Sequence, residues 1–425
     1  MGRLLIKVLV FLSPLLVFSA DNRLTEKVKL HLYLKGVEYL KTANYIGALE
    51  IFHFLGNYRD SQTLYRSTER FFSPIPAKVF KSEPTIRVAI ARFVDLTLTC
   101  PQKAEKVFFK VPPKGAFRKI SYKSGFYKKL TLKGKKGCEL TINGISYGKL
   151  PIDVDIDLVE YLGSAIAVLK LPLEFYLKGV LPSEVYPSWN IEALKAQAVA
   201  SRTYALFNIY RAREAGKPFD VDSTTNYQAF KIPQRILPQI AEAVDKTRGE
   251  VITYRGSLIY AMFHSNSGGC THSFKEITGL NLPYLSRVEE KCDLKNLKWT
   301  TWNKNLSKRR VEQILASLAG RRLRITDMEI KRNSCGRGLD ITLLLKDGER
   351  ITLPLSVYFR LEAKIPSDWF YVIGKSGRYF LLSGRGFGHG LGMSQWGAYC
   401  LSQKGWNYKE ILRFYYRGTE IEKIY

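Results

Sequence analysis

Hydrophobic and polar residues change their spacing along this chain, and each change marks a segment with a different expected structure. Residues 21–75 have apolar positions at helical spacing, and Pro74 and Pro76 end this segment. Residues 77–170 instead hold short runs such as TIRVAIARF and SAIAVLKLP, separated by glycine, lysine and proline, which is typical of β-strands. Residues 171–425 mix long helical patterns with strand-like runs. The chain is therefore predicted to have an α+β fold.

The stretch GVEYLKTANYIGALEIFHFLG, within residues 21–75, has the spacing of one tetratricopeptide repeat. Gly36, Tyr39, Ala48 and Phe52 occupy the positions at which two helices of a hairpin touch. A single copy cannot stack into a solenoid. The segment is therefore either a helical appendage that binds a partner or a plain helical cap.

Residues 171–425 are predicted to form the main helical part of the fold, with a β-rich insert around 307–383. The insert is expected to begin with a helix over 307–320. A further helix is indicated near the carboxyl end, because Asn407 and Glu410 have the spacing of a capping box.

A helix predicted from Asn190 to about Glu214 places cations on an apolar face. Arg202 falls on a stripe of alanine and isoleucine, and Lys195 lies beside it. An unpaired buried charge is expensive, so Arg202 needs a carboxylate or an anionic ligand. The candidate carboxylate is Glu184, in the proline-flanked stretch LPSEVYPSWN. Glu184 is either a general acid whose pKa burial raises, an exposed loop residue or the partner of Arg202.

Glycine alternates with larger residues in GRGFGHGLGMSQWGA, residues 384–398. The stretch lacks the lysine and hydroxyl residue that follow the glycines of a phosphate-binding P-loop. Alternating glycine favours a strand with one bare face, which lets a backbone or a flat ligand come close. On such a surface, His389 and Gln395 are expected to line a sugar-binding cleft. The alternative is that the glycines serve core packing only.

The stretch FHSNSGGCTHSFKE and a cysteine further on supply an acceptable ligand set for structural Zn²⁺: His264, Cys270, His272 and Cys292. Their spacing is not that of a zinc finger. A Cys270–Cys292 disulfide is the competing interpretation, since the chain has six cysteines and disulfides are natural in an exported protein. A third interpretation leaves His264 as a substrate contact.

Charge and the first residues indicate where the protein works. The net charge of +28 favours an anionic partner, which is a nucleic acid, a membrane surface or an acidic wall polymer. Residues 1–20 have two basic residues, an apolar run and small residues at the end, as in a secretory signal. The alternative is an uncleaved amino-terminal anchor. Either form exports the rest of the chain to the periplasm or cell envelope, which argues against a nucleic-acid partner.

Several stretches, in order, resemble the family of SpoIID sporulation proteins and LytB amidase enhancers: LPLEFYLKGVLPSEV, EALKAQAVASRTYA, FHSNSGG, and GRGFGHGLGMSQWGA followed by ILRFYYRGTEI. The resemblance runs with gaps from about residue 84 to 425 and leaves out the amino-terminal helical segment. It implies a secreted protein that acts on bacterial peptidoglycan. In SpoIID-type members the implied activity is lytic transglycosylation, preferably of strands stripped of stem peptides.

The resemblance also assigns residues. Glu184 matches the catalytic carboxylate, and Lys195 and Arg202 match basic helix positions near it. In the stretch STTNYQAF, Tyr227 and Gln228 are expected to contact the glycan. Some members bind zinc through residues that match His264 and Cys270, but their remaining ligands do not map onto this chain.

The resemblance implies that Glu184 protonates the glycosidic oxygen between N-acetylmuramic acid and N-acetylglucosamine. The same carboxylate then takes the proton of the C6 hydroxyl, which closes a 1,6-anhydro ring without a required cofactor. A nearby Arg202 would oppose the acid step by lowering the pKa of Glu184. The alternative functions are a non-catalytic, wall-binding amidase enhancer and a zinc-dependent wall hydrolase. Expected partners are glycan strands and, through residues 21–75, an amidase or other wall machinery.

Overall fold

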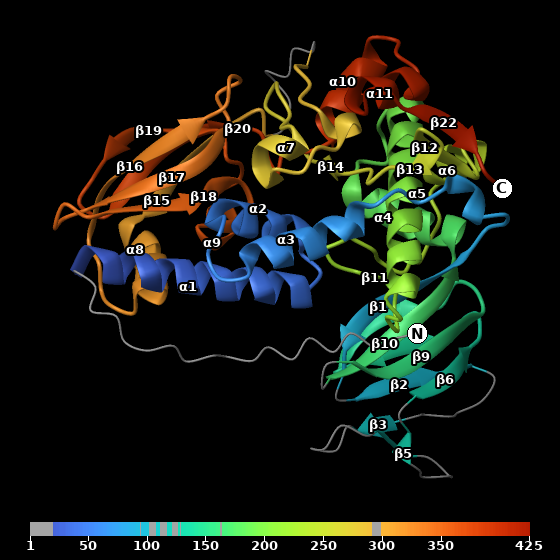
Figure 1. Ribbon diagram of the computed structural model, residues 1–425. Coiled ribbons are helices and arrows are strands. Elements are labelled where there is room, and N and C mark those ends of the chain that lie inside the picture. Colours follow the sequence, from blue (N-terminus) through green and yellow to red (C-terminus); the bar gives the residue numbers. More distant parts are fainter. Residues whose placement is uncertain are drawn as a thin grey trace.

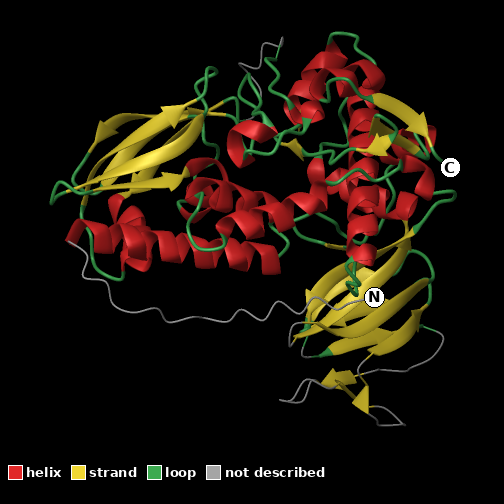
Figure 2. Cartoon of the chain, viewed as in Figure 1, coloured by secondary structure: helices red, strands yellow, loops and turns green. Residues whose placement is uncertain are grey.

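The computed structural model combines amino-terminal helices, a β region, a helical core and a strand-rich insert (Figure 1). It describes residues 20–93, 95–101, 108–110, 117–120, 126–127, 129–161, 164–290 and 299–425. The predicted secretory signal, residues 1–20, lies outside the described residues except for Ala20. The largest sheet lies apart from the helical core (Figure 2), which agrees with the predicted α+β class. No helix in the described ranges is long and apolar enough to cross a membrane.

The amino-terminal segment forms helices α1 (Ala20–Lys41), α2 (Tyr45–Leu55) and α3 (Ser61–Glu69). Helices α1 and α2 make a hairpin in which Gly36 faces Phe52. A Cβ atom at Gly36 would lie 2.7 Å from the Phe52 ring, so glycine permits this close approach. The hairpin expected from the sequence is therefore present.

This hairpin packs against the insert of the same chain. Helix α1 contacts α8 (Lys308–Ala319), and α2 contacts the short π-helix η4 (Leu355–Phe359). The side chains between them form one buried hydrophobic cluster. At its edge the buried carboxylate of Glu50 accepts the backbone N–H groups of Val357 and Tyr358, each at 2.8 Å. The helical segment therefore covers part of the insert.

The insert consists of α8, two antiparallel sheets and a helical turn. The first sheet has the order β16–β17–β18, and the second has the order β15–β20–β19. Their bounds are β15 (Thr301–Ser307), β16 (Ile325–Arg332), β17 (Gly338–Leu345), β18 (Arg350–Pro354), β19 (Phe370–Lys375) and β20 (Tyr379–Arg385). Helix α9 (Arg360–Glu362) follows η4.

The β region lies below the core in Figure 1 and contains a sheet of order β11–β1–β10–β9–β6. Its strands are β1 (Thr85–Arg92), β6 (Lys129–Gly134), β9 (Val154–Tyr161), β10 (Ser164–Pro172) and β11 (Val221–Asp222). Smaller sheets hold β2 (Leu96–Thr99), β3 (Phe108–Lys110), β4 (Phe117–Ile120), β5 (Phe126–Tyr127), β7 (Glu139–Ile142) and β8 (Ile145–Lys149). A Cys100–Cys138 disulfide joins two parts of this region. Strand β10 runs directly into the first core helix.

The helical core surrounds one long helix. Its members are α4 (Leu173–Glu184), α5 (Ile191–Glu214), α6 (Pro238–Lys246), α10 (Gln395–Gln403) and α11 (Tyr408–Tyr415). Most side chains of α5 are buried, and it contacts the other four helices. Asn190 caps α5 by accepting the Glu192 N–H at 2.9 Å. Asn407 and Glu410 form a capping box at the start of α11, as predicted.

Short elements join distant parts of the chain around this core. They are η1 (Arg70–Phe72), η2 (Ala77–Val79), β12 (Glu250–Tyr254), β13 (Ser257–Leu258), β14 (Phe263–His264), α7 (Phe274–Thr278), η3 (Pro283–Leu285), β21 (Met393–Ser394) and β22 (Glu420–Lys423). The parallel pair β14 and β21 has the greatest consequence for the site. It places Ser265, which follows β14, near Gln395, which follows β21.

The glycine-rich stretch is a loop, so the predicted strand is wrong beyond Arg385, where β20 ends. Gly386, Gly388, Gly390 and Gly392 have φ angles of 76°, 107°, 74° and 69°. These left-handed conformations do not belong to a strand, and glycine adopts them without a Cβ clash. The loop therefore passes close to β14 and to a buried arginine of the insert.

Candidate active-site cleft

Glu184 is the last residue of α4 rather than a member of the predicted loop. The helix continues past Pro182 because two bonds hold its last turn. Ser183 Oγ donates to the Gly179 carbonyl at 3.2 Å, and Val185 N donates to the Leu181 carbonyl at 2.9 Å. The chain becomes extended at Val185, so the carboxylate projects from a rigid helix end.

The carboxylate of Glu184 has two hydrogen-bond donors. Ala229 N donates to Oε1 at 2.7 Å, and Gln395 Nε2 donates to Oε2 at a long 3.5 Å. Burial raises the pKa of Glu184, while the bonds from Ala229 and Gln395 act in the opposite direction. A raised pKa extends the protonated form toward neutral pH, which general-acid chemistry requires.

A cleft of about 250 Å³ opens at this carboxyl group. The end of α4, the loop before α5, the residue after β14 and the start of α10 supply most of its walls. Its lining residues are Pro182, Ser183, Glu184, Val185, Tyr186, Pro187, Trp189, Ser265, Trp299, Gln395 and Trp396. Glu184 is the one acidic residue among these described lining residues.

Aromatic rings form two groups at this cleft. Trp396 lies 4.8 Å from Trp189 and 5.8 Å from Tyr186 between ring centroids. Trp299 lies 4.5 Å from Phe387 between ring centroids. Tyr186 is 47% exposed and Phe387 is 38% exposed, so these rings are open to a ligand. The cleft thus combines aromatic rings with the polar groups of Glu184, Gln395, Ser183 and Ser265.

Sequence reasoning missed Tyr186, Trp189 and Trp299 as cleft residues. The first two had a usable signal, since they stand two and five positions after Glu184 in LPSEVYPSWN. Trp299 had none, because the fold brings it from a distant part of the chain.

Of the two cleft residues predicted in the glycine stretch, Gln395 lies in the cleft and His389 does not. Gln395 opens α10, which Ser394 caps by accepting the Gly397 N–H at 3.1 Å. His389 belongs to the preceding loop and lines a separate cavity.

Arg202 is not beside Glu184, and the predicted pairing of these two residues is wrong. Arg202 is fully buried, and its guanidinium binds both carboxylate oxygens of Glu174 at 2.7 and 2.8 Å. Glu174 stands at the opposite end of α4 from Glu184, which explains the separation. A buried, bidentate pair cannot reach substrate, so Arg202 is structural. The expected lowering of the Glu184 pKa by Arg202 therefore does not apply.

Lys195 also points elsewhere. Its Nζ bonds Glu192 at 2.6 Å and lies 5.6 Å from the ring centroid of Tyr408. Lys195 is not among the residues that line the cleft. The structure gives it a role in packing α11 against α5.

Gln228 supports the site without facing substrate. It is fully buried, accepts the Tyr176 hydroxyl at 3.2 Å and donates to the Ser201 carbonyl at 3.2 Å. The expected glycan contact of Gln228 is therefore wrong, because no ligand can reach it. It anchors the loop whose Ala229 N–H holds Glu184. Tyr227 is half-buried and lines the same separate cavity as His389.

The predicted Cys270–Cys292 disulfide is wrong, because Cys270 pairs with Cys335 of the insert. Cys292 lies outside the described residues. The insert folds back onto the core at this point. The spacing of the cysteines in the sequence does not predict this long-range pairing.

The predicted zinc ligands are not assembled. A sulfur in a disulfide is not a thiolate ligand. His272 Nε2 bonds Asp368 at 2.8 Å, and His264 Nδ1 bonds the Leu391 carbonyl at 3.1 Å. Within the described ranges, no group of three or more histidine, cysteine or acidic residues could hold a metal ion. These residues do not fit a zinc site, and no step of the chemistry is assigned to zinc.

The fold and cleft define a protein whose half-buried carboxyl group faces an aromatic-lined groove, and sequence comparison gives its family. The family model "Stage II sporulation protein" (SpoIID) matches residues 161–254, which include α4, α5 and Glu184. Stage II sporulation protein D of Bacillus subtilis is 30% identical over 271 residues, which is 60% of this chain and 76% of that protein. The chain belongs to the SpoIID family.

Two further relatives extend the comparison. An uncharacterized protein of Brachyspira hyodysenteriae is 37% identical over 286 residues, covering 66% of this chain and 73% of the relative. The amidase enhancer of Bacillus subtilis is 29% identical over 295 residues, covering 58% of this chain but 40% of that protein. The family thus includes proteins named for sporulation and for amidase enhancement.

Proposed function

We propose that this protein is a peptidoglycan lytic transglycosylase that cleaves the bond between N-acetylmuramic acid and N-acetylglucosamine with Glu184. One observation carries the proposal. A half-buried carboxyl group with a raised pKa faces an open, aromatic-lined cleft in which no other described lining residue is acidic. Ordinary glycosidases use two carboxylates about 5–9.5 Å apart, whereas a transglycosylase needs one.

In the first step, protonated Glu184 donates its proton to the glycosidic oxygen, and the bond to C1 of the muramic acid breaks. The sugar becomes oxocarbenium-like. The Ala229 N–H, at 2.7 Å from Oε1, stabilises the carboxylate that forms.

In the second step, the Glu184 carboxylate accepts the proton of the C6 hydroxyl. The freed oxygen attacks C1 and closes the 1,6-anhydro ring, which returns Glu184 to its protonated form. Water is not consumed. The rings of Tyr186 and Trp396 and the amide of Gln395 line the cleft, and we expect them to hold the sugar chain during both steps.

The test is mass spectrometry of products from purified glycan strands, both peptide-stripped and peptide-bearing. The wild type is expected to release 1,6-anhydromuramic ends, preferentially from stripped strands. Glu184→Gln should lower their formation by a factor of 100 or more, because proton transfer by a positioned side chain contributes roughly 10²–10⁴-fold. Glu329→Gln, an exposed carboxylate of the insert, is the matched control and should act as wild type.

The proposal fails if Glu184→Gln still forms anhydro ends at the rate of the wild type. The second candidate, a non-catalytic wall-binding protein that enhances an amidase, is favoured by the amidase-enhancer relative. In that case neither the wild type nor Glu184→Gln cuts glycan strands, but both variants bind the strands and raise amidase activity.

The proposed place of action is the bacterial cell envelope. The charge of +28 suits binding to an anionic wall. The tetratricopeptide-like character of residues 21–75, and their role in holding a wall enzyme, stay predictions. The insert already covers one side of the α1–α2 hairpin, so such a partner would bind the outer side.

A further inference from the structure

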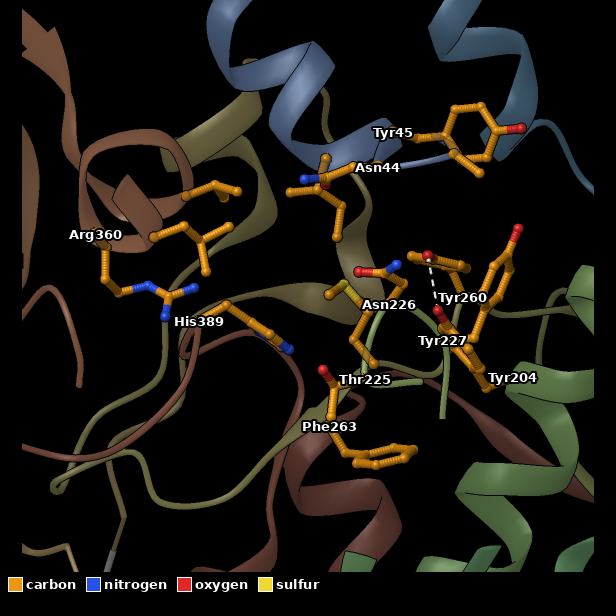
Figure 3. Close-up of a pocket in the computed structure, with 15 residues that line it drawn as sticks. Asn44, Tyr45, Tyr204, Thr225, Asn226, Tyr227, Tyr260, Phe263, Arg360 and His389 are labelled. Atoms are coloured by element: carbon orange, nitrogen blue, oxygen red, sulfur yellow. Dashed lines mark hydrogen bonds between the residues drawn. The ribbon is translucent and has the colours of Figure 1, made fainter. Parts of the chain in front are cut away.

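A second cavity, of about 230 Å³ (Figure 3), is present in addition to the cleft at Glu184. Two segments reach both spaces. In the loop after β11, Asn226 and Tyr227 line the cavity while Ala229 N bonds Glu184. After β14 begins, Phe263 lines the cavity and Ser265 lines the cleft. A polymer bound at Glu184 would therefore pass close to the cavity.

Three parts of the fold meet at this cavity. The turn between α1 and α2 supplies residues 43–46, and the insert supplies Val357, Arg360 and Leu361. The core and the glycine loop supply the rest. The matched family segment, residues 161–254, accounts for only part of the wall. The amino-terminal helices and the insert thus build a site beside a family cleft.

Arg360 brings a positive charge into the cavity. Its Nε donates to the Ser356 carbonyl at 2.7 Å. Its two terminal nitrogens have no hydrogen-bond or ion-pair partner in the part of the chain that the structure describes. Figure 3 shows the guanidinium pointing toward His389. A half-buried guanidinium whose terminal nitrogens lack such a partner is expected to take an anionic ligand.

The two carboxylates whose charges act on Arg360, Asp368 and Glu50, both have other partners. Glu50 accepts the N–H groups of residues 357 and 358. Asp368 binds His272 and Arg337, each at 2.8 Å. No aspartate or glutamate is among the described residues that line the cavity. The charge of Arg360 is therefore open to a ligand.

The other polar groups suit a single carboxylate. His389 Nδ1 accepts the Leu391 N–H at 3.0 Å, and burial lowers the pKa of His389 to about 3, with help from Arg360. The ring is thus neutral and adds no second charge. Thr225 and Asn226 offer a hydroxyl and an amide at the rim. One guanidinium with neutral donors matches a monoanion held by a two-pronged contact.

We propose that this cavity binds a carboxylate of peptidoglycan through Arg360 while Glu184 acts on the adjoining glycan. The nature of the polymer rests on the proposed function. The carboxylate comes either from the lactyl group of a peptide-free muramic acid or from a stem peptide. The cavity is smaller than the roughly 300–1,000 Å³ of sites that enclose a drug-sized ligand. It therefore fits one acyl or amino-acid unit.

The experiment measures binding of three small probes to the full chain by isothermal titration calorimetry. The probes are N-acetylmuramic acid, muramyl dipeptide, and N-acetylglucosamine as the carboxylate-free reference. None contains the glycosidic bond that Glu184 is proposed to cleave. Arg360→Gln should weaken binding of a carboxylate probe by about tenfold or more, as for loss of a charge-assisted bond.

Two further variants distinguish a specific loss of probe binding from a loss caused by misfolding. Asn226→Asp adds a negative charge at an exposed rim position and should weaken the same probe. Arg350→Gln removes an exposed arginine of the insert and should leave binding unchanged. Melting temperatures of all variants are compared with the wild type.

A loss confined to N-acetylmuramic acid identifies the lactyl carboxylate, and a loss confined to muramyl dipeptide identifies the stem peptide. The inference is overturned if neither carboxylate probe binds better than N-acetylglucosamine, or if Arg360→Gln and Asn226→Asp leave their affinities unchanged. Arg360-dependent binding without strand cleavage would instead refute only the proposed catalysis.

Discussion

At the scale of single residues, two carboxylates of the same helix have opposite environments. Glu174, at the start of α4, forms a buried bidentate pair with Arg202. Glu184, at the end of α4, has one short bond from Ala229 and one long bond from Gln395. The first arrangement occupies both oxygens of Glu174 with the Arg202 guanidinium, and the second leaves Glu184 facing the cleft with a raised pKa. The different surroundings therefore give Glu174 a structural role and make Glu184 the candidate for chemistry.

The first prediction concerns that structural pair. Glu174→Gln leaves the Arg202 charge buried without a counter-charge, which should lower the free energy of unfolding by about 3–5 kcal/mol. Equilibrium urea unfolding measures the change. Replacing both residues, as Glu174→Gln with Arg202→Met, should cost less than the single change, because no charge is then left unpaired. A double variant that is as destabilised as Glu174→Gln alone, or more so, would contradict this account.

Residue patterns predicted the helix that carries Arg202 but not the partner of Arg202. The apolar stripe and Asn190 cap fixed the helix over Ile191–Glu214 because both signals are local. The ion pair depends on how α4 crosses α5, and Glu174 and Glu184 are both available on α4. Only the three-dimensional packing decides between them. For the same reason Trp299 was not predicted as a cleft residue, since it shares no local sequence pattern with Glu184.

At the scale of elements, the glycine stretch shows the limit of pattern reading. Alternation predicted a strand, but the left-handed φ values at four glycines make a loop. Alternating glycine permits both conformations, and the neighbouring chain selects one. The helix after it begins at Gln395, where Ser394 caps it by accepting the Gly397 N–H.

A second prediction concerns the contact between α2 and η4. Burial raises the pKa of Glu50 to about 7, although the Val357 and Tyr358 N–H bonds oppose the shift. The folded protein therefore binds this proton more tightly than the unfolded chain, whose glutamate pKa is near 4.5. The stability that Glu50 adds is present below about pH 4.5 and is lost as pH rises through about 7.

The expected result is a fall in unfolding free energy on the order of 3 kcal/mol across that window, since one pKa unit corresponds to about 1.4 kcal/mol. Glu50→Gln should flatten this part of the pH profile. Hydrogen exchange at Val357 and Tyr358 reports the contact directly. Glu69→Gln, on α3, serves as the control and should keep the wild-type slope. An unchanged slope in Glu50→Gln would remove Glu50 as the cause.

At the scale of the whole molecule, the two proposed sites are built from different parts of the fold. Glu184 stands on the helical core, whereas the second cavity needs the amino-terminal hairpin, the core and the insert together. The Cys270–Cys335 disulfide joins core to insert across 65 residues. The cavity should therefore depend on this bond more than the catalytic carboxyl group does.

The third prediction tests that dependence. Cys270→Ser with Cys335→Ser should lower the free energy of unfolding by about 4 kcal/mol, the entropic value of closing a loop of this length. Because Arg360 is in the insert, Arg360-dependent binding of the carboxylate probe should fall more than formation of anhydro ends. Calorimetry and product analysis on one preparation measure both quantities.

The Cys100–Cys138 disulfide provides the matched control. It closes 38 residues of the β region, so its removal should cost a similar, roughly 4 kcal/mol of stability. Neither cysteine lines the cleft or the cavity. Cys100→Ser with Cys138→Ser should thus lower stability. The ratio of carboxylate-probe binding to formation of anhydro ends should stay as in the wild type. If the two disulfide variants change that ratio equally, general loss of stability explains the effect, and the insert does not hold Arg360 in place through Cys335.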